Sequence, residues 1–316
     1  MKLINFTTQG VTRTGAIVED KVIDLNYAYQ AQLKAEGKYR YEEIAHAFVP
    51  ATADELYQGG KESIQLAQNA IDFILANPDS FDKKVIYKKE EVKVEAPVQK
   101  PGKIICVGHN YREHILEMGR ELPSNPVIFA KFANTILGPE DDIPFFPISE
   151  QLDYEAEFTF VVGKQARNVS EEDALEYVAG YTITNDVTYR DIQRRTIEWL
   201  QGKTIDGSAP MGPYLVTSDE LQDPSGLDVV LKVNGEVRQS TNTANLVFDV
   251  KKLVAFLSGL MTLEPGDVVL TGTPGGVGFA MDPQQFLKDG DVVTIEIDKI
   301  GTLENTVKAT QVVATV

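Results

Sequence analysis

The 316 residues exceed what one hydrophobic core usually accommodates, so one large domain and a smaller one are expected. Hydrophobic residues make up 43% and charged residues 24% of the chain, which is typical of a globular protein without a long disordered tail. The net charge of −17 argues against binding to nucleic acids or anionic membranes, because phosphate contact requires clustered Lys and Arg.

The chain opens directly in a strand-like pattern, without a signal peptide, and no apolar stretch approaches the length of a membrane span. A cytoplasmic protein is therefore expected. Cys106 is the only cysteine, which excludes an intramolecular disulfide. The apolar run 103–108 around it favours a small core residue, with a nucleophile as the alternative.

Short strands are predicted near the N-terminus, and two helical patterns follow at residues 26–37 and 52–75. No acid–base or phosphate motif occurs in this region. Residues 83–102 alternate charged residues with valine and end in two prolines, which indicates a strand that leads into a linker. These features predict a small α/β domain over residues 1–98 and a catalytic domain over residues 99–316.

From residue 103 onward the sequence is mostly strand-like. A helix is expected to begin at the N-cap Ser170, and residues 249–260 form an amphipathic helical pattern. Many strands with few helices favour a curled or sandwiched β-domain over alternating βαβ units. The predicted strands span residues 104–107, 127–130, 154–162, 180–184, 212–216, 229–233, 267–271 and 292–297.

Two carboxylates on one strand face are the first candidate for chemistry. Glu155 and Glu157 are two residues apart in a predicted strand, so their side chains point to the same face. Their mutual repulsion is relieved either by solvent, on an exposed strand face, or by a divalent cation. With Asp186 as a third oxygen ligand, the set suits Mg²⁺ or Mn²⁺.

His114 and Glu117 are three residues apart and share a face if they lie on a helical turn. A carboxylate beside an imidazole raises its basicity, which suits a general base, although a surface His–Glu pair is the alternative. Lys131 and Lys203 could each bind a substrate carboxylate or an oxyanion, or be ordinary surface charges.

The segment T-G-T-P-G-G-V-G, residues 271–278, is a glycine-rich loop after a predicted strand. It lacks the features of a nucleotide-binding loop, but its backbone N–H groups and the Thr273 hydroxyl could bind a small carboxylate. The chain has only three histidines, one of them remote from the acidic set, so a three-histidine zinc site is disfavoured.

Taken in order, these motifs resemble the fumarylacetoacetate hydrolase family over about residues 100–316. The motifs are K-I-I-C-V-G-H-N-Y-R-E-H, F-A-K, D-Y-E-A-E, G-Y-T-I-T-N-D-V-T-Y-R-D-I-Q, G-K-T-I-D, M-G-P-Y-L-V-T, V-N-G-E-V-R-Q and L-E-P-G-D-V-V-L-T-G-T-P-G-G-V-G. The resemblance implies an α+β protein with a mixed β-sandwich roll, a homodimer and a Mg²⁺ or Mn²⁺ site. The N-terminal segment resembles the variable extra domain that many members carry.

The resemblance also assigns roles to individual residues. It implies that Glu155, Glu157 and Asp186 bind the metal and that His114 and Glu117 form a His–Glu dyad on a lid. It further implies that Lys203 is catalytic and that the substrate contacts Gln193 and Thr273. Lys131 also occupies a motif position and is predicted to bind substrate.

The expected function is a metal-dependent hydrolase that cleaves a C–C bond in acylpyruvate-type substrates. In this scheme the metal stabilises an enolate and the His–Glu dyad activates water. The same site would support an oxaloacetate decarboxylase or an enol–keto tautomerase or isomerase. A non-catalytic metal-binding protein is a third hypothesis. In the enzyme schemes the partner is a small anionic 2-oxo acid.

Overall fold

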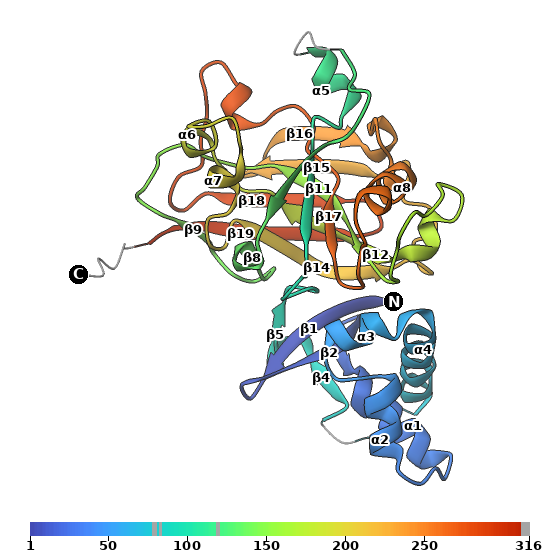
Figure 1. The fold of residues 1–316 in the computed structure, drawn as a ribbon. Helices are drawn as coiled ribbons and strands as arrows, with labels where there is room; N and C mark the ends of the chain where they lie inside the picture. The colour runs from blue at the N-terminus through green and yellow to red at the C-terminus, as the bar shows by residue number, and fades with distance from the viewer. Residues whose placement is uncertain (78–80, 82–83, 118–120, 311–316) are drawn as a thin grey trace, which may run out of the picture.

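The computed structural model describes residues 1–77, 81, 84–117 and 121–310. Its largest element is a mixed, mainly antiparallel sheet that extends from the N-terminal segment into the larger C-terminal body (Figure 1). The path of this sheet is β4 (Ile86–Lys88), β3 (Lys21–Asp24), β2 (Val11–Val18), β1 (Lys2–Thr8), β14 (Ala209–Thr217), β12 (Val178–Asn185), β11 (Ala156–Val162), β17 (Val268–Leu270), β6 (Ile104–Gly108) and β7 (Val127–Lys131). Two short strands, β5 (Lys93–Glu95) and β8 (Ile136–Leu137), pair with β1 and β14.

A second sheet of five strands packs against the C-terminal part of the first. Every second side chain along strands of this sheet is buried. The buried side chains, such as Leu231 and Ile295, belong to one core cluster with Phe158 and Phe160 of β11. The amphipathic helix α8 (Val250–Leu260) adds its buried face to the same cluster. The strand order is β16 (Glu236–Asn242), β15 (Asp228–Val233), β18 (Val292–Ile297), β19 (Gly301–Ala309) and β9 (Ile143–Phe145).

The N-terminal segment combines strands β1 to β3 with four helices. Asp24 is the last residue of β3 and the N-cap of the first helix. Its side chain accepts a hydrogen bond from the Tyr27 backbone N–H. The helices form a second core cluster that also contains Cys106, Leu215 and Leu270 of the large sheet. The helices are α1 (Leu25–Ala35), α2 (Tyr41–Phe48), α3 (Ala53–Gln58) and α4 (Gly60–Ala76).

The observed architecture is α+β, as the sequence predicted. Strand β1 pairs antiparallel with β14, with Leu3 opposite Leu215, so the N-terminal segment and the C-terminal body share one sheet. The division into domains at residues 98 and 99 therefore stays a prediction. Within the described ranges, no helix is long and apolar enough to cross a membrane.

Two helix predictions need correction. The pattern over residues 52–75 forms two helices, α3 and α4, separated at Gly59–Gly60. The helix expected after Ser170 is reduced to the 3₁₀ turn η4 (Ala174–Tyr177). The Ser170 hydroxyl accepts a hydrogen bond from the Asp173 N–H within a turn, and β12 already begins at Val178. The residues between Ser170 and β12 form turns and η4 in place of an α-helix.

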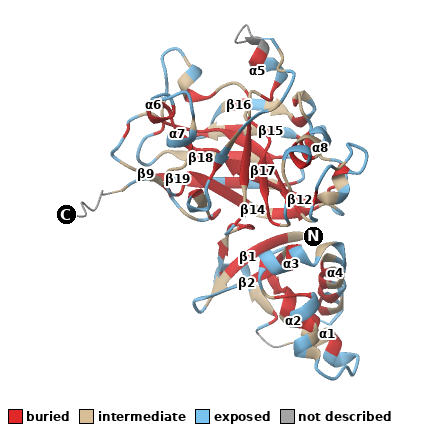
Figure 2. Ribbon diagram, viewed as in Figure 1, coloured by how far each residue is buried: buried red, intermediate tan, exposed pale blue. Residues whose placement is uncertain are grey.

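Buried residues concentrate in the strands of the two sheets and on the inward faces of the helices (Figure 2). Cys106 lies in β6 and is fully buried. Burial raises the pKa of its thiol well above the usual value, and the nearby carboxylates of Asp186 and Glu157 add to the effect. These observations fit a core residue and not a nucleophile.

Candidate metal centre

Three acidic side chains meet where β11 and β12 lie side by side. Glu157 is on β11 opposite Thr184, Glu155 directly precedes this strand, and Asp186 directly follows β12. The Asp186 N–H donates to the Glu155 carbonyl at 2.9 Å, which fixes the two backbones against each other. One oxygen from each carboxylate lies within 4.8 Å of the others. The predicted set is therefore brought together.

The three carboxylates are withdrawn from solvent. Glu155 is 7% exposed, Glu157 1% and Asp186 0%. An unpaired buried carboxylate is costly, so this cluster requires compensating positive charge. The carboxylates therefore do not lie on a solvated strand face, which was the alternative to a metal site.

Three cationic side chains supply part of that compensation. The Lys203 Nζ contacts Glu155 Oε2 at 2.8 Å and Asp186 Oδ2 at 2.6 Å. The Lys131 Nζ contacts Asp186 Oδ1 at 2.8 Å, and the Arg190 Nη1 contacts Glu155 Oε1 at 2.7 Å. Within the described part of the chain, no cationic side chain pairs with Glu157.

The ionisation of the cluster follows from these contacts. Burial, and then the charges of Asp186 and Glu155, raise the pKa of Glu157 well above its usual value. Burial alone would raise the pKa of Asp186, but the ammonium groups of Lys131 and Lys203 outweigh it and lower that pKa. Burial opposes the charge of Lys203, yet Asp186 and Glu155 raise its pKa. These two carboxylates therefore favour the protonated form of Lys203.

The glycine-rich loop after β17 closes over Glu157. The Gly272 N–H donates to Glu157 Oε2 at 2.6 Å. Gly272 has φ +103°, and a Cβ there would lie 2.8 Å from the Val107 carbonyl oxygen and 3.0 Å from Asn110 Cβ. Asn110 donates from Nδ2 to the Thr271 carbonyl at 2.7 Å and thereby holds the loop. A glycine is thus required at this close approach.

The donor set fits a hard divalent cation. Glu155, Glu157 and Asp186 offer only oxygen ligands, which Mg²⁺ and Mn²⁺ prefer. Carboxylate oxygens have two lone pairs, so those that accept from Lys203 can still bind a cation. A cation would also offset the charge of Glu157. Hydrogen bonds to carboxylate ligands are typical of the shell around a bound metal.

The predicted dyad lies on α5 (Arg112–Glu117), which follows β6 and Asn110. His114 and Glu117 are within this helix, as the spacing required. The helix extends from the C-terminal body near β16 (Figure 1). The side chains of both residues lie outside what the structure describes, so the dyad stays a prediction.

The other predicted residues surround the carboxylates. Lys203 ends α7 (Leu200–Lys203), and Gln193 ends α6 (Arg190–Gln193), where its Oε1 accepts from Arg190 at 3.2 Å. The Thr273 hydroxyl accepts from Gln239 Nε2 at 2.9 Å, next to Gly272. Lys131 is fully buried, and its ammonium group is bonded to Asp186. Direct contact with substrate stays a prediction for all four.

Arg190 and Asp153 were not predicted as site residues. The Arg190 Nε donates to Asp153 Oδ2 at 2.7 Å, while its Nη2 is buried without a hydrogen-bond partner among the described residues. The Asp153 carboxylate also accepts from the N–H groups of Gly278 and Phe279. The sequence feature that could have identified Arg190 is a charged residue within a segment of aromatic and aliphatic residues, which are usually buried.

The comparisons with known proteins agree with this geometry. A family model described as "Fumarylacetoacetate (FAA) hydrolase C-terminal" matches residues 103–308, about two thirds of the chain. The chain belongs to the fumarylacetoacetate hydrolase family. The residues of the acidic cluster all lie within the matched range.

Two similar relatives cover nearly the whole chain. The mitochondrial oxaloacetate tautomerase fahd2 of Xenopus laevis is 40% identical over 97% of this chain and 90% of its own. The oxaloacetate tautomerase YisK of Bacillus subtilis is 40% identical over 92% of this chain and 94% of its own.

Solved structures of the family share the fold. The fumarylacetoacetate hydrolase of Exiguobacterium antarcticum is 35% identical with a TM-score of 0.78, over 98% of this chain and all of its own. Maleylpyruvate hydrolase from Sphingobium sp. SYK-6, in complex with manganese(II) and pyruvate, is 28% identical with a TM-score of 0.74 over the same shares. The N-terminal segment is included in these matches.

Proposed function

We propose that this protein is a metal-dependent oxaloacetate tautomerase, which interconverts the keto and enol forms of the substrate. The observation that carries the proposal is the 40% identity, over nearly the full chain, to two relatives that are named oxaloacetate tautomerases. The family and the buried acidic cluster support the broader statement that the protein is an enzyme acting on 2-oxo acids.

Glu155, Glu157 and Asp186 would hold Mg²⁺ or Mn²⁺. A bound divalent cation would stabilise negative charge that develops on a substrate oxygen. The choice of cation is supported by the oxygen-only donor set and by the manganese(II) in the structure of maleylpyruvate hydrolase.

The cationic side chains suit an anionic substrate. The Arg190 Nη2, buried and without a partner among the described residues, is a spare donor beside Glu155. Gln193 accepts a hydrogen bond from Arg190, and Thr273 follows Gly272; both would help to orient a substrate carboxylate. Because its pKa is raised, Lys203 stays protonated at neutral pH and would donate hydrogen bonds without acting as a base.

Tautomerisation moves one proton between carbon 3 of oxaloacetate and the keto oxygen. That step needs a group that can take up and return a proton near neutral pH, and His114 with Glu117 supplies this chemistry. We assign the dyad this role as part of the proposal. We also propose that the protein is a homodimer in the cytoplasm, which sedimentation velocity and fractionation would test.

Hydrolysis of acylpyruvates is the second candidate function. The maleylpyruvate hydrolase structure, which contains pyruvate and covers 98% of this chain, favours it. In a hydrolase the same dyad would take a proton from water, and the bond broken would be a C–C bond. Decarboxylation of oxaloacetate would leave carbon dioxide and pyruvate.

One set of assays separates these reactions. Purified protein with Mg²⁺ or Mn²⁺ would be given oxaloacetate, acetylpyruvate and fumarylpyruvate. The ultraviolet absorbance of the enol would report tautomerisation, and coupled lactate dehydrogenase would report pyruvate. The proposal predicts faster equilibration of enol and keto oxaloacetate with little pyruvate formed. Asp186→Asn with the same metal is the blank, since free metal ions also act on oxaloacetate.

The proposal fails if wild-type and Asp186→Asn protein equilibrate oxaloacetate equally fast. Rapid pyruvate release from acetylpyruvate would instead favour the hydrolase. His114→Ala should slow the enzyme roughly 10²- to 10⁴-fold if the dyad moves the proton. An unchanged rate in this variant would exclude the dyad from the reaction.

A further inference from the structure

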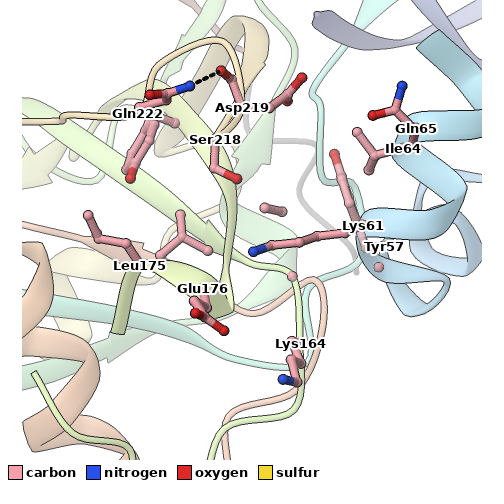
Figure 3. A pocket seen from close by; sticks show the side chains of 15 residues that line it. Tyr57, Lys61, Ile64, Gln65, Lys164, Leu175, Glu176, Ser218, Asp219 and Gln222 are labelled. Atoms are coloured by element: carbon pink, nitrogen blue, oxygen red, sulfur yellow. Dashed lines mark hydrogen bonds between the residues drawn. The ribbon is translucent and has the colours of Figure 1, made fainter. Parts of the chain in front are cut away.

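A second cavity lies away from the metal centre, between the N-terminal helices and the C-terminal body (Figure 3). Its volume is about 610 Å³, within the range of small-molecule sites. The start of α4 forms one side, and Gly163 and Lys164, just after β11, form part of the other side with the beginning of β12. No residue of the acidic cluster lines it.

The walls of this cavity are largely apolar. Tyr57 and Ile64 come from the N-terminal helices, while Leu175 and Val178 come from the turn before β12 and from β12 itself. Tyr57 belongs to the N-terminal core cluster and Val178 to the core of the sandwich, so the cavity lies where the two cores approach each other. An apolar group of a ligand would be sheltered here.

Four charged residues line the same cavity, two of each sign. Lys61 extends from α4 across the space toward Leu175 and Glu176, and Lys164 lies on the same side as Glu176 (Figure 3). Asp219 lies with Gln222 at the opposite edge (Figure 3). In the described part of the chain these four charges form no ion pair within 4.0 Å with one another or with any other side chain. All four residues are exposed, and the Lys164 ammonium group lies over the Tyr177 ring, 4.7 Å from its centroid.

The Tyr181 side chain also lines this space. Tyr181 lines the cavity and is 1% exposed, and its hydroxyl has no hydrogen-bond partner among the described residues. Burial, and then the charge of Asp223, raise the pKa of this phenol, so it remains a neutral donor. Helix α4 begins at the cavity without a side-chain cap, which leaves its first N–H groups to another acceptor. Both features offer donors to a ligand.

We propose that this cavity binds a zwitterionic α-amino acid with an apolar side chain. The carboxylate would contact Lys61, Lys164 and the start of α4, and the ammonium group would contact Asp219 at the opposite edge. The side chain would pack on Ile64 and Leu175. A ligand with a single charge would match only one end of the cavity, whereas a zwitterion can match the lysines at one end and Asp219 at the other.

Strand β12, which lines this cavity, also leads to the metal centre. Tyr181 precedes Asp186 by five residues on β12, which is roughly 17 Å along a strand. The Tyr181 ring stacks on Phe158, with centroids 5.4 Å apart, and Phe158 is next to Glu157. A ligand in the cavity would therefore contact the strand that leads to Asp186 and pairs with β11, which is a route to regulation. The proposal does not depend on which reaction the metal centre performs.

Calorimetric titration of the full-length protein tests this site. L-Leucine and L-phenylalanine are the probes, each measured with Mg²⁺ and again with EDTA. We expect saturable binding of at least one of them in both conditions. 4-Methylpentanoate, which lacks the ammonium group, and 3-methylbutylamine, which lacks the carboxylate, should bind at least tenfold more weakly than L-leucine. Equal binding of the singly charged analogues would overturn the proposal, as would no binding of either amino acid.

Variants locate the binding. Lys61→Glu is at an exposed helix position and reverses one charge of the cavity, so it should weaken binding at least tenfold. Lys38→Glu reverses an exposed lysine of the same segment outside the cavity and should leave binding unchanged. Asp186→Asn should also retain binding. If Lys61→Glu binds as wild type does, or if Asp186→Asn abolishes binding, the ligand sits elsewhere and the proposal is wrong.

Discussion

The close approach of Gly272 to Glu157 makes a quantitative prediction for Gly272→Ala. An alanine at φ +103° costs about 1–3 kcal/mol in backbone strain. Its Cβ would meet the Val107 carbonyl oxygen at 2.8 Å and Asn110 Cβ at 3.0 Å, and overpacking of this kind costs about 1–3 kcal/mol more. The free energy of unfolding should therefore fall by about 2–6 kcal/mol.

The metal site should be affected as well. The loop must move to accept the methyl group, and the Gly272 N–H then loses its hydrogen bond to Glu157. A hydrogen bond to a charged group contributes about 1.5–3 kcal/mol. Mg²⁺ should therefore bind roughly 10- to 100-fold more weakly. Calorimetric titration of Mg²⁺ and Mn²⁺ below the unfolding temperature would measure this directly.

Gly266→Ala is the matched control. Gly266 has φ +88° in the turn before β17, but a Cβ there meets nothing within 4 Å. This variant should lose only the strain energy of about 1–3 kcal/mol, with unchanged metal affinity. For a chain of this length each kcal/mol lowers the melting temperature by about 1.5 °C. If both variants bind Mg²⁺ equally well, the Gly272 N–H does not hold Glu157 for the metal.

Two further predictions concern buried groups. Arg190→Met removes the buried partner of Asp153 and Glu155 and should cost about 3–5 kcal/mol in urea unfolding, while Arg195→Met, at an exposed position, should change stability by less than about 0.5 kcal/mol. Similar losses in both variants would show that the Arg190 ion pairs contribute nothing. Because burial raises its pKa, Cys106 should stay unreactive toward a thiol reagent in native protein at pH 9, where a free thiol is largely ionised, and should react fully in denaturant. Rapid native reaction would contradict its burial.

Local patterns in the sequence were sufficient for many elements. Strand periodicity alone placed Glu155 and Glu157 on one face. Successive side chains of a strand point to opposite faces, so two residues that are two positions apart share a face whatever the rest of the chain does. Eight strands were predicted from such local patterns, namely β6, β7, β11, β12, β14, β15, β17 and β18, whereas β16 and β19 were not predicted. The helix after Ser170 was predicted wrongly, because a serine hydroxyl that accepts from the N–H three residues on begins a turn as readily as a helix.

The sequence by itself therefore determined the residue types of the cluster, the strands that carry them and the family. Only the tertiary structure decided which charges compensate the carboxylates. Lys131 is 55 residues from Asp186, and Lys203 is 48 residues from Glu155. The Gly272 N–H is 115 residues from Glu157. Contacts over such separations depend on strand pairing and burial throughout the chain, and a local pattern carries no information on them.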